Sequence, residues 1–160
     1  AEGLVQSYIH AGGRIGVLLE VNSETDFVAR TEEFQAFVKD LAMHIAAANP
    51  EYVTESEIPE EQKEKEKAVL MAKAREDGKK EEMLEKIVGG QLKKWAADIC
   101  LMNQKYVKNP DQTIEQLLQE KIAKIGENLV IRRFVRFELG EGIEKKKEDF
   151  AAEVAAQLNN

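Results

Sequence analysis

The sequence predicts an α+β fold, in which a three-stranded antiparallel sheet is packed with helices, with an antiparallel helical hairpin and a C-terminal tail helix attached. Apolar and polar residues alternate near both ends of the chain, which is typical of strands with one buried face. Between these ends, apolar residues recur at helical spacing. The 160 residues, 43% of them hydrophobic, are enough to build a sizeable core. We therefore expect one core unit over residues 1–140 and a tail module over residues 141–160.

Two strands are predicted at the start of the chain. Residues 4–10 alternate in polarity, and residues 15–21 carry apolar side chains at every second position. Gly12 and Gly13, between these runs, can adopt the positive backbone angles of a tight reversal, which predicts a β-hairpin. A third strand is predicted near the other end, and its buried face comprises Leu129, Ile131, Val135, Phe137 and Leu139. Three strands can hold a sheet, whereas two alone are marginal.

The first long helix is predicted to begin after Thr31 and to end at Asn49 and the proline that follows it. Its apolar residues share one face: Phe34, Phe37, Val38, Leu41 and Ile45. Further along, Thr113 and Gln116 have the form of a capping box. The helix that they open is expected to end at Gly126.

A helical hairpin of coiled-coil type is predicted over about residues 59–97. Residues 60–77 are dominated by Glu and Lys, as expected for a solvated helix, and residues 81–97 carry the apolar side of its partner. Gly89 and Gly90 interrupt this second helix at a cost of about 1 kcal/mol each, so we expect a close packing contact or a bend there. An amphipathic tail helix is predicted over residues 145–158.

Composition excludes several classes of partner. A net charge of −7 argues against binding nucleic acid or an anionic membrane, so we expect a protein partner. No stretch approaches the roughly 20 apolar residues of a membrane span, and the first residues lack a signal peptide, which predicts a cytosol-like compartment. Cys100 is the one cysteine, so no internal disulfide or cysteine-rich metal site can form. Because it lies in an apolar run, we expect it to be buried.

The sequence offers no catalytic constellation. Neither His10, beside the glycine turn, nor His44, within the first long helix, has a metal-ligand spacing, and no phosphate-binding loop or nucleophile elbow is present. We therefore expect no cofactor, no metal and no catalytic residue. Two rival functions stay open: a scaffold suggested by the charged residues 60–77, and a small acid–base enzyme using His10 or Asp26.

The junction after the second predicted strand is rich in residues that can cap a helix. Asn22, Ser23, Thr25 and Asp26 can each bond backbone groups ahead of a short helical turn, and Phe27 follows at once. In one interpretation Asp26 caps the turn and Phe27 packs into the core as a staple. In the other, the turn projects an aromatic wedge with an acidic neighbour, a good interface anchor. Spacing alone leaves both open.

Residues 8–30, YIHAGGRIGVLLEVNSETDFVAR, resemble the most recognisable stretch of the elongation factor Ts family. Residues 40–47, 85–88, 123–128, 132–134 and 137–142 are also similar to that family, so the resemblance covers nearly the whole chain. Members release GDP from elongation factor Tu, the GTPase that carries aminoacyl-tRNA to the ribosome, and catalyse no covalent step. The resemblance therefore implies a guanine nucleotide exchange factor that is not an enzyme.

The resemblance also implies which residues meet the GTPase. Asp26 and Phe27 match a pair that intrudes beside the partner's nucleotide and magnesium site, and His10 matches a histidine that reaches the GTPase. The tail helix matches one that docks on the partner's nucleotide-binding domain. The implied partner-binding residues are Thr25, Asp26, Phe27, Val28, His10, Phe150 and Val154.

Two departures from the family pattern modify these expectations. Nothing before Ala1 matches the small three-helix module with which the family normally begins, so we expect reduced affinity. The chain also has one sheet-and-hairpin unit where longer members have two, as in the short form of some bacterial lineages and organelles. Pairing of two copies through their sheets would supply the second half, which implies a homodimer or a 2:2 complex with elongation factor Tu. The expected location is the bacterial cytoplasm, with the plastid stroma or mitochondrial matrix as alternatives.

Overall fold

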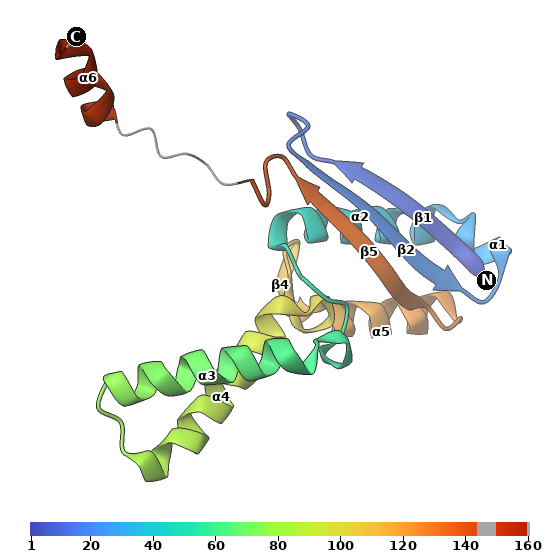
Figure 1. Ribbon diagram of the computed structural model, residues 1–160. Coiled ribbons are helices and arrows are strands. Elements are labelled where there is room, and N and C mark those ends of the chain that lie inside the picture. Colours follow the sequence, from blue (N-terminus) through green and yellow to red (C-terminus); the bar gives the residue numbers. More distant parts are fainter. Residues whose placement is uncertain (144–149, 160) are drawn as a thin grey trace.

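The computed structural model describes residues 1–143 and 150–159. Strands near both ends of the core enclose a helical middle, which confirms the predicted α+β class (Figure 1). In chain order the elements are β1 (Glu2–Ile9), β2 (Ile15–Ser23), α1 (Asp26–Ala29), α2 (Glu32–Ala48), the 3-10 turn η1 (Glu55–Glu57), α3 (Glu60–Glu76), α4 (Glu81–Ile99), the 3-10 turn η2 (Leu101–Asn103), β3 (Lys105–Tyr106), β4 (Asn109–Thr113), α5 (Ile114–Ile125), β5 (Val130–Glu138) and α6 (Phe150–Leu158).

The main sheet has the strand order β1-β2-β5 and is antiparallel throughout. β1 and β2 form the predicted hairpin, in which Glu2 pairs with Ser23 and Ile9 pairs with Gly16. Gly12 has a φ of 93° in the connecting turn, a conformation that side chains with a Cβ atom rarely adopt. The glycine pattern therefore identified the turn correctly.

β5 contains a β-bulge that decides which of its side chains are buried. Val21 of β2 pairs with Ile131, but the neighbouring Glu20 pairs with Arg133, so Arg132 is an extra residue in β5. Side chains alternate between the two faces of a regular strand. After the extra residue, all later positions of β5 therefore lie on the face opposite to the one that strict alternation from Ile131 would give them.

The expectation of one continuous buried face in β5 is therefore wrong. Leu129 and Ile131 are buried as predicted. Val135, Phe137 and Leu139 are exposed, and 74% of Phe137 is accessible. The alternation in the sequence was real, but the bulge turns its second half to the other face of the sheet.

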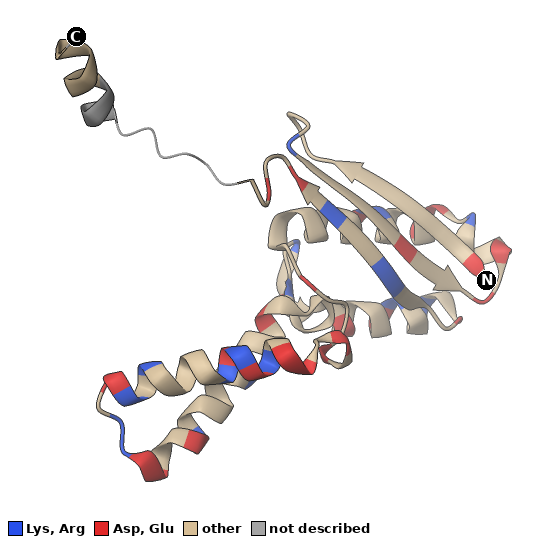
Figure 2. Cartoon of the chain, in the orientation of Figure 1, with Lys and Arg blue, Asp and Glu red and all other residues tan. Residues whose placement is uncertain are grey.

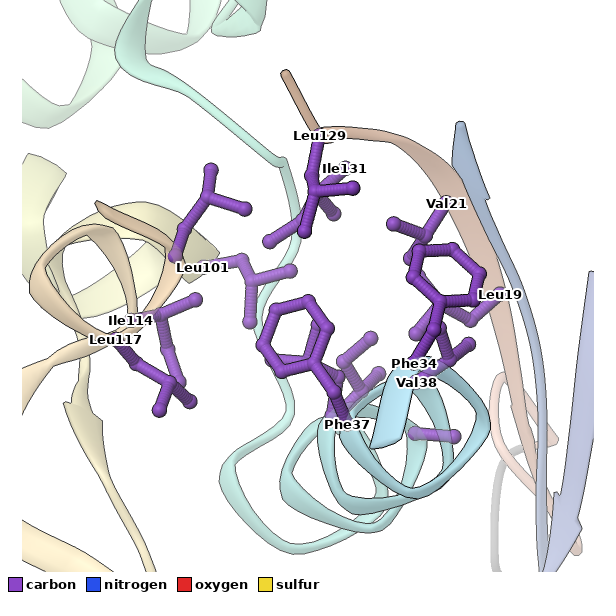
Figure 3. Packing of buried hydrophobic residues seen from close by; sticks show 14 of the residues in the cluster. Leu19, Val21, Phe34, Phe37, Val38, Leu101, Ile114, Leu117, Leu129 and Ile131 are labelled. Atoms are coloured by element: carbon purple, nitrogen blue, oxygen red, sulfur yellow. The ribbon is translucent and has the colours of Figure 1, made fainter. Parts of the chain in front are cut away.

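α2 covers the inner face of the sheet and carries most of the core. Thr31 caps it by accepting a hydrogen bond from the Phe34 N–H at 3.2 Å, and Asn49 ends it in the left-handed conformation with a φ of 48°. Arg136, on the inner side of β5, donates to the Ala46 carbonyl at 2.9 Å near the end of α2. Figure 3 shows the packed side chains of the sheet, α2, η2 and α5: Leu19, Val21, Phe34, Phe37, Val38, Leu101, Ile114, Leu117, Leu129 and Ile131. The predicted helix and its buried face are confirmed.

α3 and α4 form the predicted helical hairpin. It projects away from the sheet (Figure 1), and charged residues of both signs cover much of it (Figure 2). Ala74, Leu84 and Val88 form a small core of its own. A Cβ atom placed on Gly89 or Gly90 would meet no atom of a neighbouring described element within 4 Å, so the first of the two expectations for these glycines, a close packing contact, is wrong.

A buried histidine fastens the small β3–β4 hairpin, which the sequence pattern did not predict. The Nδ1 atom of His44 on α2 accepts the Val107 backbone N–H at 3.2 Å, which leaves Nε2 to donate to Gln104 Oε1 at 3.0 Å. The ring is fully buried, and this burial lowers the pKa of His44 below 6.5. The neutral imidazole is therefore part of the folded structure.

The remaining helices largely follow the predictions. α5 opens with the full capping box, since Thr113 Oγ1 accepts the Gln116 N–H at 3.2 Å and Gln116 Oε1 accepts the Thr113 N–H at 2.8 Å. Gly126 ends α5 with a φ of 82°. α6 confirms the later part of the predicted tail helix, whose expected start over residues 145–149 lies outside the described residues. Within the described part of the chain, every helix is too short or too polar to cross a membrane.

Candidate functional site

The turn between β2 and α2 is organised by Thr25. Its Oγ1 accepts the Val28 N–H at 3.3 Å and so caps α1. Asp26 instead forms an ion pair with Arg30 at 2.7 Å, in which both side chains are largely exposed. The interpretation in which Asp26 caps the turn is therefore wrong. Ser23 supports the turn, as expected, by donating its hydroxyl to the Thr25 carbonyl at 2.8 Å.

α1 turns adjacent side chains to opposite environments. Phe27 is 81% exposed, whereas Val28 is only 7% exposed and belongs to the core. Ala29 is buried as well. In a single helical turn, successive residues point about 100° apart, so the burial of Val28 and Ala29 turns Phe27 outward. The interpretation of Phe27 as a core staple is wrong, and Val28 faces the core and not solvent.

Glu127, in the loop between α5 and β5, holds this turn from a distant part of the chain. Its Oε1 accepts the backbone N–H groups of Glu24 and Thr25, both at 3.1 Å. Its Oε2 accepts the Thr25 hydroxyl at 2.6 Å. The hydrogen bond from that hydroxyl, followed by the two backbone bonds, lowers the pKa of Glu127 despite some opposing desolvation. Sequence reasoning missed this residue, because no local pattern connects it to Thr25, 102 residues earlier.

His10 lies at the opposite end of the sheet from Phe27. It follows β1, next to the turn of the first hairpin, and its Nδ1 lies 3.0 Å from the Tyr8 hydroxyl. The eight residues of β1 rise about 3.3 Å each, so roughly 25 Å separates the two ends of the hairpin. The structure therefore does not bring His10 into the same site as Phe27. Beside His10 lies a mainly apolar pocket of about 290 Å³, lined in part by Tyr8, Ile15 and Met43.

The outer face of the sheet, opposite α2, is uncovered by any described element. It faces the viewer in Figures 1 and 2, and the three strands that form it are coloured as uncharged residues over most of their length in Figure 2. Val5, Leu18, Val135 and Phe137 are exposed there, and a hollow of about 260 Å³ lies among Val5, Leu18 and Val135. We call these four residues the outer apolar patch. A contiguous group of exposed apolar side chains is typical of an interaction surface.

An ion cluster borders the outer apolar patch. Glu20 Oε1 lies 2.8 Å from Arg132 Nη1 and 2.8 Å from Arg133 Nε. The hydrogen bond from Arg133 is the main reason that the pKa of Glu20 is lowered. Asn22 also donates to Glu20, at 3.1 Å, so it supports the strand and not the turn that follows. The bulge at Arg132 places both guanidinium groups on one carboxylate.

The surroundings of the other candidate residues give no support for a chemical site. Cys100 is buried, as predicted, and burial together with nearby acidic residues raises the pKa of its thiol to about 11. Among the described residues, no group of three or more His, Cys, Asp or Glu side chains is placed to hold a metal ion. In α6, Val154 and Leu158 are exposed. Phe150 begins that helix, but its side chain lies outside the described ones.

Comparison with known proteins gives a consistent result. A family model described as "Elongation factor TS" matches residues 1–141. The elongation factor Ts of Geobacter sulfurreducens is 64% identical over 155 residues, which cover 97% of this chain and 72% of that protein. Those of Acetivibrio thermocellus and Carboxydothermus hydrogenoformans are 59% and 60% identical, over 99% and 98% of this chain and 74% and 72% of theirs.

Proposed function

Since this chain belongs to the elongation factor Ts family and thus serves translation elongation, we propose that it is a guanine nucleotide exchange factor for elongation factor Tu. In this proposal it binds the GTPase and promotes GDP release by inserting Asp26 and Phe27 beside the nucleotide and magnesium site. No covalent step is involved, so the chain is not an enzyme in the usual sense. Its named relatives are bacterial, and we propose the bacterial cytoplasm as the location.

The observation that carries the proposal is the exposure of Phe27 on an anchored turn. A phenylalanine that is 81% exposed gains much by entering an apolar pocket of a partner, because its apolar area leaves water. α1 is capped by Thr25 and tied to the core through Val28, so little conformational freedom is lost on binding. Asp26 lies beside the ring, and its exposed ion pair with Arg30 can be exchanged for new partners at low cost.

Exchange then follows from thermodynamic linkage. If binding of this chain lowers the affinity of the GTPase for GDP by some factor, GDP lowers the affinity for this chain by the same factor. A coupling of about 4 kcal/mol corresponds to roughly a thousandfold change. An aromatic ring that displaces the phosphate and magnesium contacts of the GTPase is the source of this coupling in our proposal.

Two further surfaces complete the proposal. We propose that α6 docks on the nucleotide-binding domain of the GTPase through an apolar side that includes Phe150 and Val154. The exposure of Val154 and Leu158, one helical turn apart, supports this. We also propose that the outer apolar patch pairs with the same patch of a second copy, giving a homodimer or a 2:2 complex. Stacked sheets bury such faces about 10 Å apart.

The decisive experiment is the release of a fluorescent GDP analogue from elongation factor Tu. The unaltered chain should accelerate release, and Phe27→Ala should reduce this acceleration about thirtyfold, as expected for a hot-spot residue worth about 2 kcal/mol. Val69→Ala, which removes an apolar side chain 61% exposed on α3, is the matched control and should have no effect. A chain ending at residue 144 should bind more weakly if the tail docks.

The same assay separates the rival functions. Binding of the unaltered chain without faster release would contradict the exchange mechanism and favour a scaffold. An acid–base enzyme would require turnover of a substrate that is lost on replacing His10 or Asp26. Equal acceleration by the unaltered chain and Phe27→Ala would exclude the wedge.

A further inference from the structure

We propose that Glu127 is a positioning residue for Phe27. It fixes the direction of this side chain by holding the turn between β2 and α1 through hydrogen bonds, which we call the clamp. The inference rests on the proposed function, but it concerns a residue of another segment. Glu127 itself is not proposed to touch the GTPase. It acts through the backbone of Glu24 and through Thr25.

The clamp begins from an anchored element. Gly126 ends α5 in the left-handed conformation, and its N–H donates to the Ile122 carbonyl at 2.9 Å. Leu129, two residues after Glu127, is buried in the core. Glu127 is therefore held between a helix end and the start of β5, and its carboxylate has a defined place from which to reach the turn.

The carboxylate uses both oxygen atoms on the turn. Oε1 accepts two successive backbone N–H groups, and Oε2 accepts the hydroxyl of Thr25. These N–H groups follow the end of β2 and precede the first residue of α1. Among the hydrogen bonds of the described residues, none other joins these two N–H groups to the protein. Bonds to an ionised acceptor are stronger than those between neutral groups.

Thr25 transmits the clamp to α1. Its hydroxyl donates to Glu127 at 2.6 Å and at the same time accepts the Val28 N–H at 3.3 Å. Because the hydroxyl proton points to Glu127, a lone pair of Thr25 Oγ1 is directed to the Val28 N–H. Glu127 therefore orients the hydroxyl that caps α1. α1 has four residues, and a single helical turn is unstable by itself. The direction of Phe27 therefore depends on this cap.

Loss of the clamp should weaken exchange without unfolding the protein. The turn would sample more conformations, and the cost of ordering it would be added to every encounter with the GTPase. We expect Glu127→Ala to lower exchange efficiency about tenfold, in line with the loss of hydrogen bonds to a charged group. Glu127→Gln keeps one acceptor oxygen for the N–H groups and should be affected less.

A second pair of variants tests the hydroxyl alone. Thr25→Val has nearly the same shape but can neither donate to Glu127 nor cap Val28, whereas Thr25→Ser retains both bonds. We expect loss of exchange in Thr25→Val and near-complete activity in Thr25→Ser. Glu115→Ala, an exposed acidic residue on α5, controls for the change in net charge. Denaturant unfolding should give similar stabilities for all of these proteins.

A double-mutant cycle distinguishes positioning from direct contact. If Glu127 acts only through Phe27, Glu127→Ala should have no further effect on exchange in the Phe27→Ala background. An undiminished tenfold effect in that background would overturn the proposal, because it would mean that Glu127 acts independently of the ring.

Amide hydrogen exchange in the free protein provides a test that does not need the GTPase. Glu127→Ala should accelerate exchange of the Thr25 and Val28 amides by at least about tenfold, while the amides of α2 stay protected. Unchanged exchange at these positions would overturn the clamp. If Phe27→Ala were fully active, the proposed wedge would fail, yet these amide rates would still decide whether Glu127 orders the turn.

Discussion

Among single residues, His44 shows how one protonation state is built into the fold. Its Nδ1 must accept, because the Val107 backbone N–H can only donate. Nε2 then carries the proton that Gln104 Oε1 accepts, and Gln104 in turn donates to the carbonyl groups of Ala48 and Asp98. A second proton on Nδ1 would oppose the Val107 N–H. The β3–β4 hairpin, α2 and the end of α4 therefore all depend on the neutral ring.

This arrangement predicts that stability falls as the pH falls below 6.5. The folded pKa of His44 is lowered by burial, so below 6.5 the unfolded chain takes up a proton that the folded chain resists. The contribution of His44 to the free energy of unfolding is fully present above pH 6.5. As the pH falls from 6.5 toward the folded pKa, this contribution decreases by at most about 1.4 kcal/mol per pH unit. Urea unfolding at pH 7 and pH 5.5 measures it. His44→Gln should lose stability at pH 7 but show a smaller difference between the two pH values; an equal difference would contradict the assignment.

The candidate site was only partly predictable at this scale. Capping rules select Thr25 and Asp26 equally well, and they cannot tell which one caps. In the structure Thr25 is the cap, and its hydroxyl also donates to Glu127, which lies 102 residues later in the sequence. The outward direction of Phe27 likewise follows from the burial of Val28, a tertiary fact. The resemblance to a known family made this segment the candidate site, but it did not supply these contacts.

Among the elements, α4 contains a local inconsistency that nothing around it resolves. Gly89 and Gly90 lie within the helix, yet a side chain at either position would meet open space. Glycine in a helix has more conformational freedom to lose on folding than alanine. The structure offers no packing reason for these glycines.

This openness predicts that Gly89→Ala stabilises the helical hairpin by about 1 kcal/mol. Gly126→Ala is the matched control, since a Cβ atom there also meets open space but the φ is 82°. That variant should destabilise the protein, because its backbone conformation is strained for alanine. Denaturant unfolding followed by circular dichroism compares the two. A loss of stability in Gly89→Ala would mean that the helix needs its flexibility there.

The local sequence pattern predicted most helices and strands correctly, but it did not always predict which face of an element is buried. Helices with an end signal, such as α2 with Thr31 and Asn49, were predicted almost to the residue. The short β3 and β4 were missed because Lys105–Tyr106 is too brief to show any alternation. In β5 the alternation was visible, but the bulge at Arg132 is a property of the pairing with β2. No reading of β5 alone can locate it.

For the whole molecule, the main question is what covers the outer face of the sheet. α2 and the core occupy one side, and the outer apolar patch occupies the other. Our proposal assigns this patch to a second copy of the chain. The Glu20 cluster at its border has two arginines for one carboxylate, so it carries one excess positive charge, which would attract an acidic group of the partner copy.

Dimer formation through the outer apolar patch predicts that Phe137→Asp yields a monomer. A carboxylate in place of a ring that is 74% exposed would be buried without a partner in the interface, which is strongly unfavourable. Sedimentation equilibrium of the unaltered and altered chains at micromolar concentration measures the change. Val69→Asp on α3 should leave the association unchanged. A monomeric unaltered chain, or an unaffected Phe137→Asp dimer, would contradict the proposal.

The bulge at Arg132 also gives β5 a place where its length can change in evolution. Without that one residue, Ile131 would still pair with Val21 and Arg133 with Glu20, so Val135 and Phe137 would keep the outer face and Phe134 and Arg136 the side of α2. The sheet would keep its outer apolar patch and would become regular at this point. A residue inserted in the regular part of β5 without a second bulge would instead exchange the faces of all positions beyond it. Arg132 is therefore a residue that β5 can lose without an exchange of its two faces.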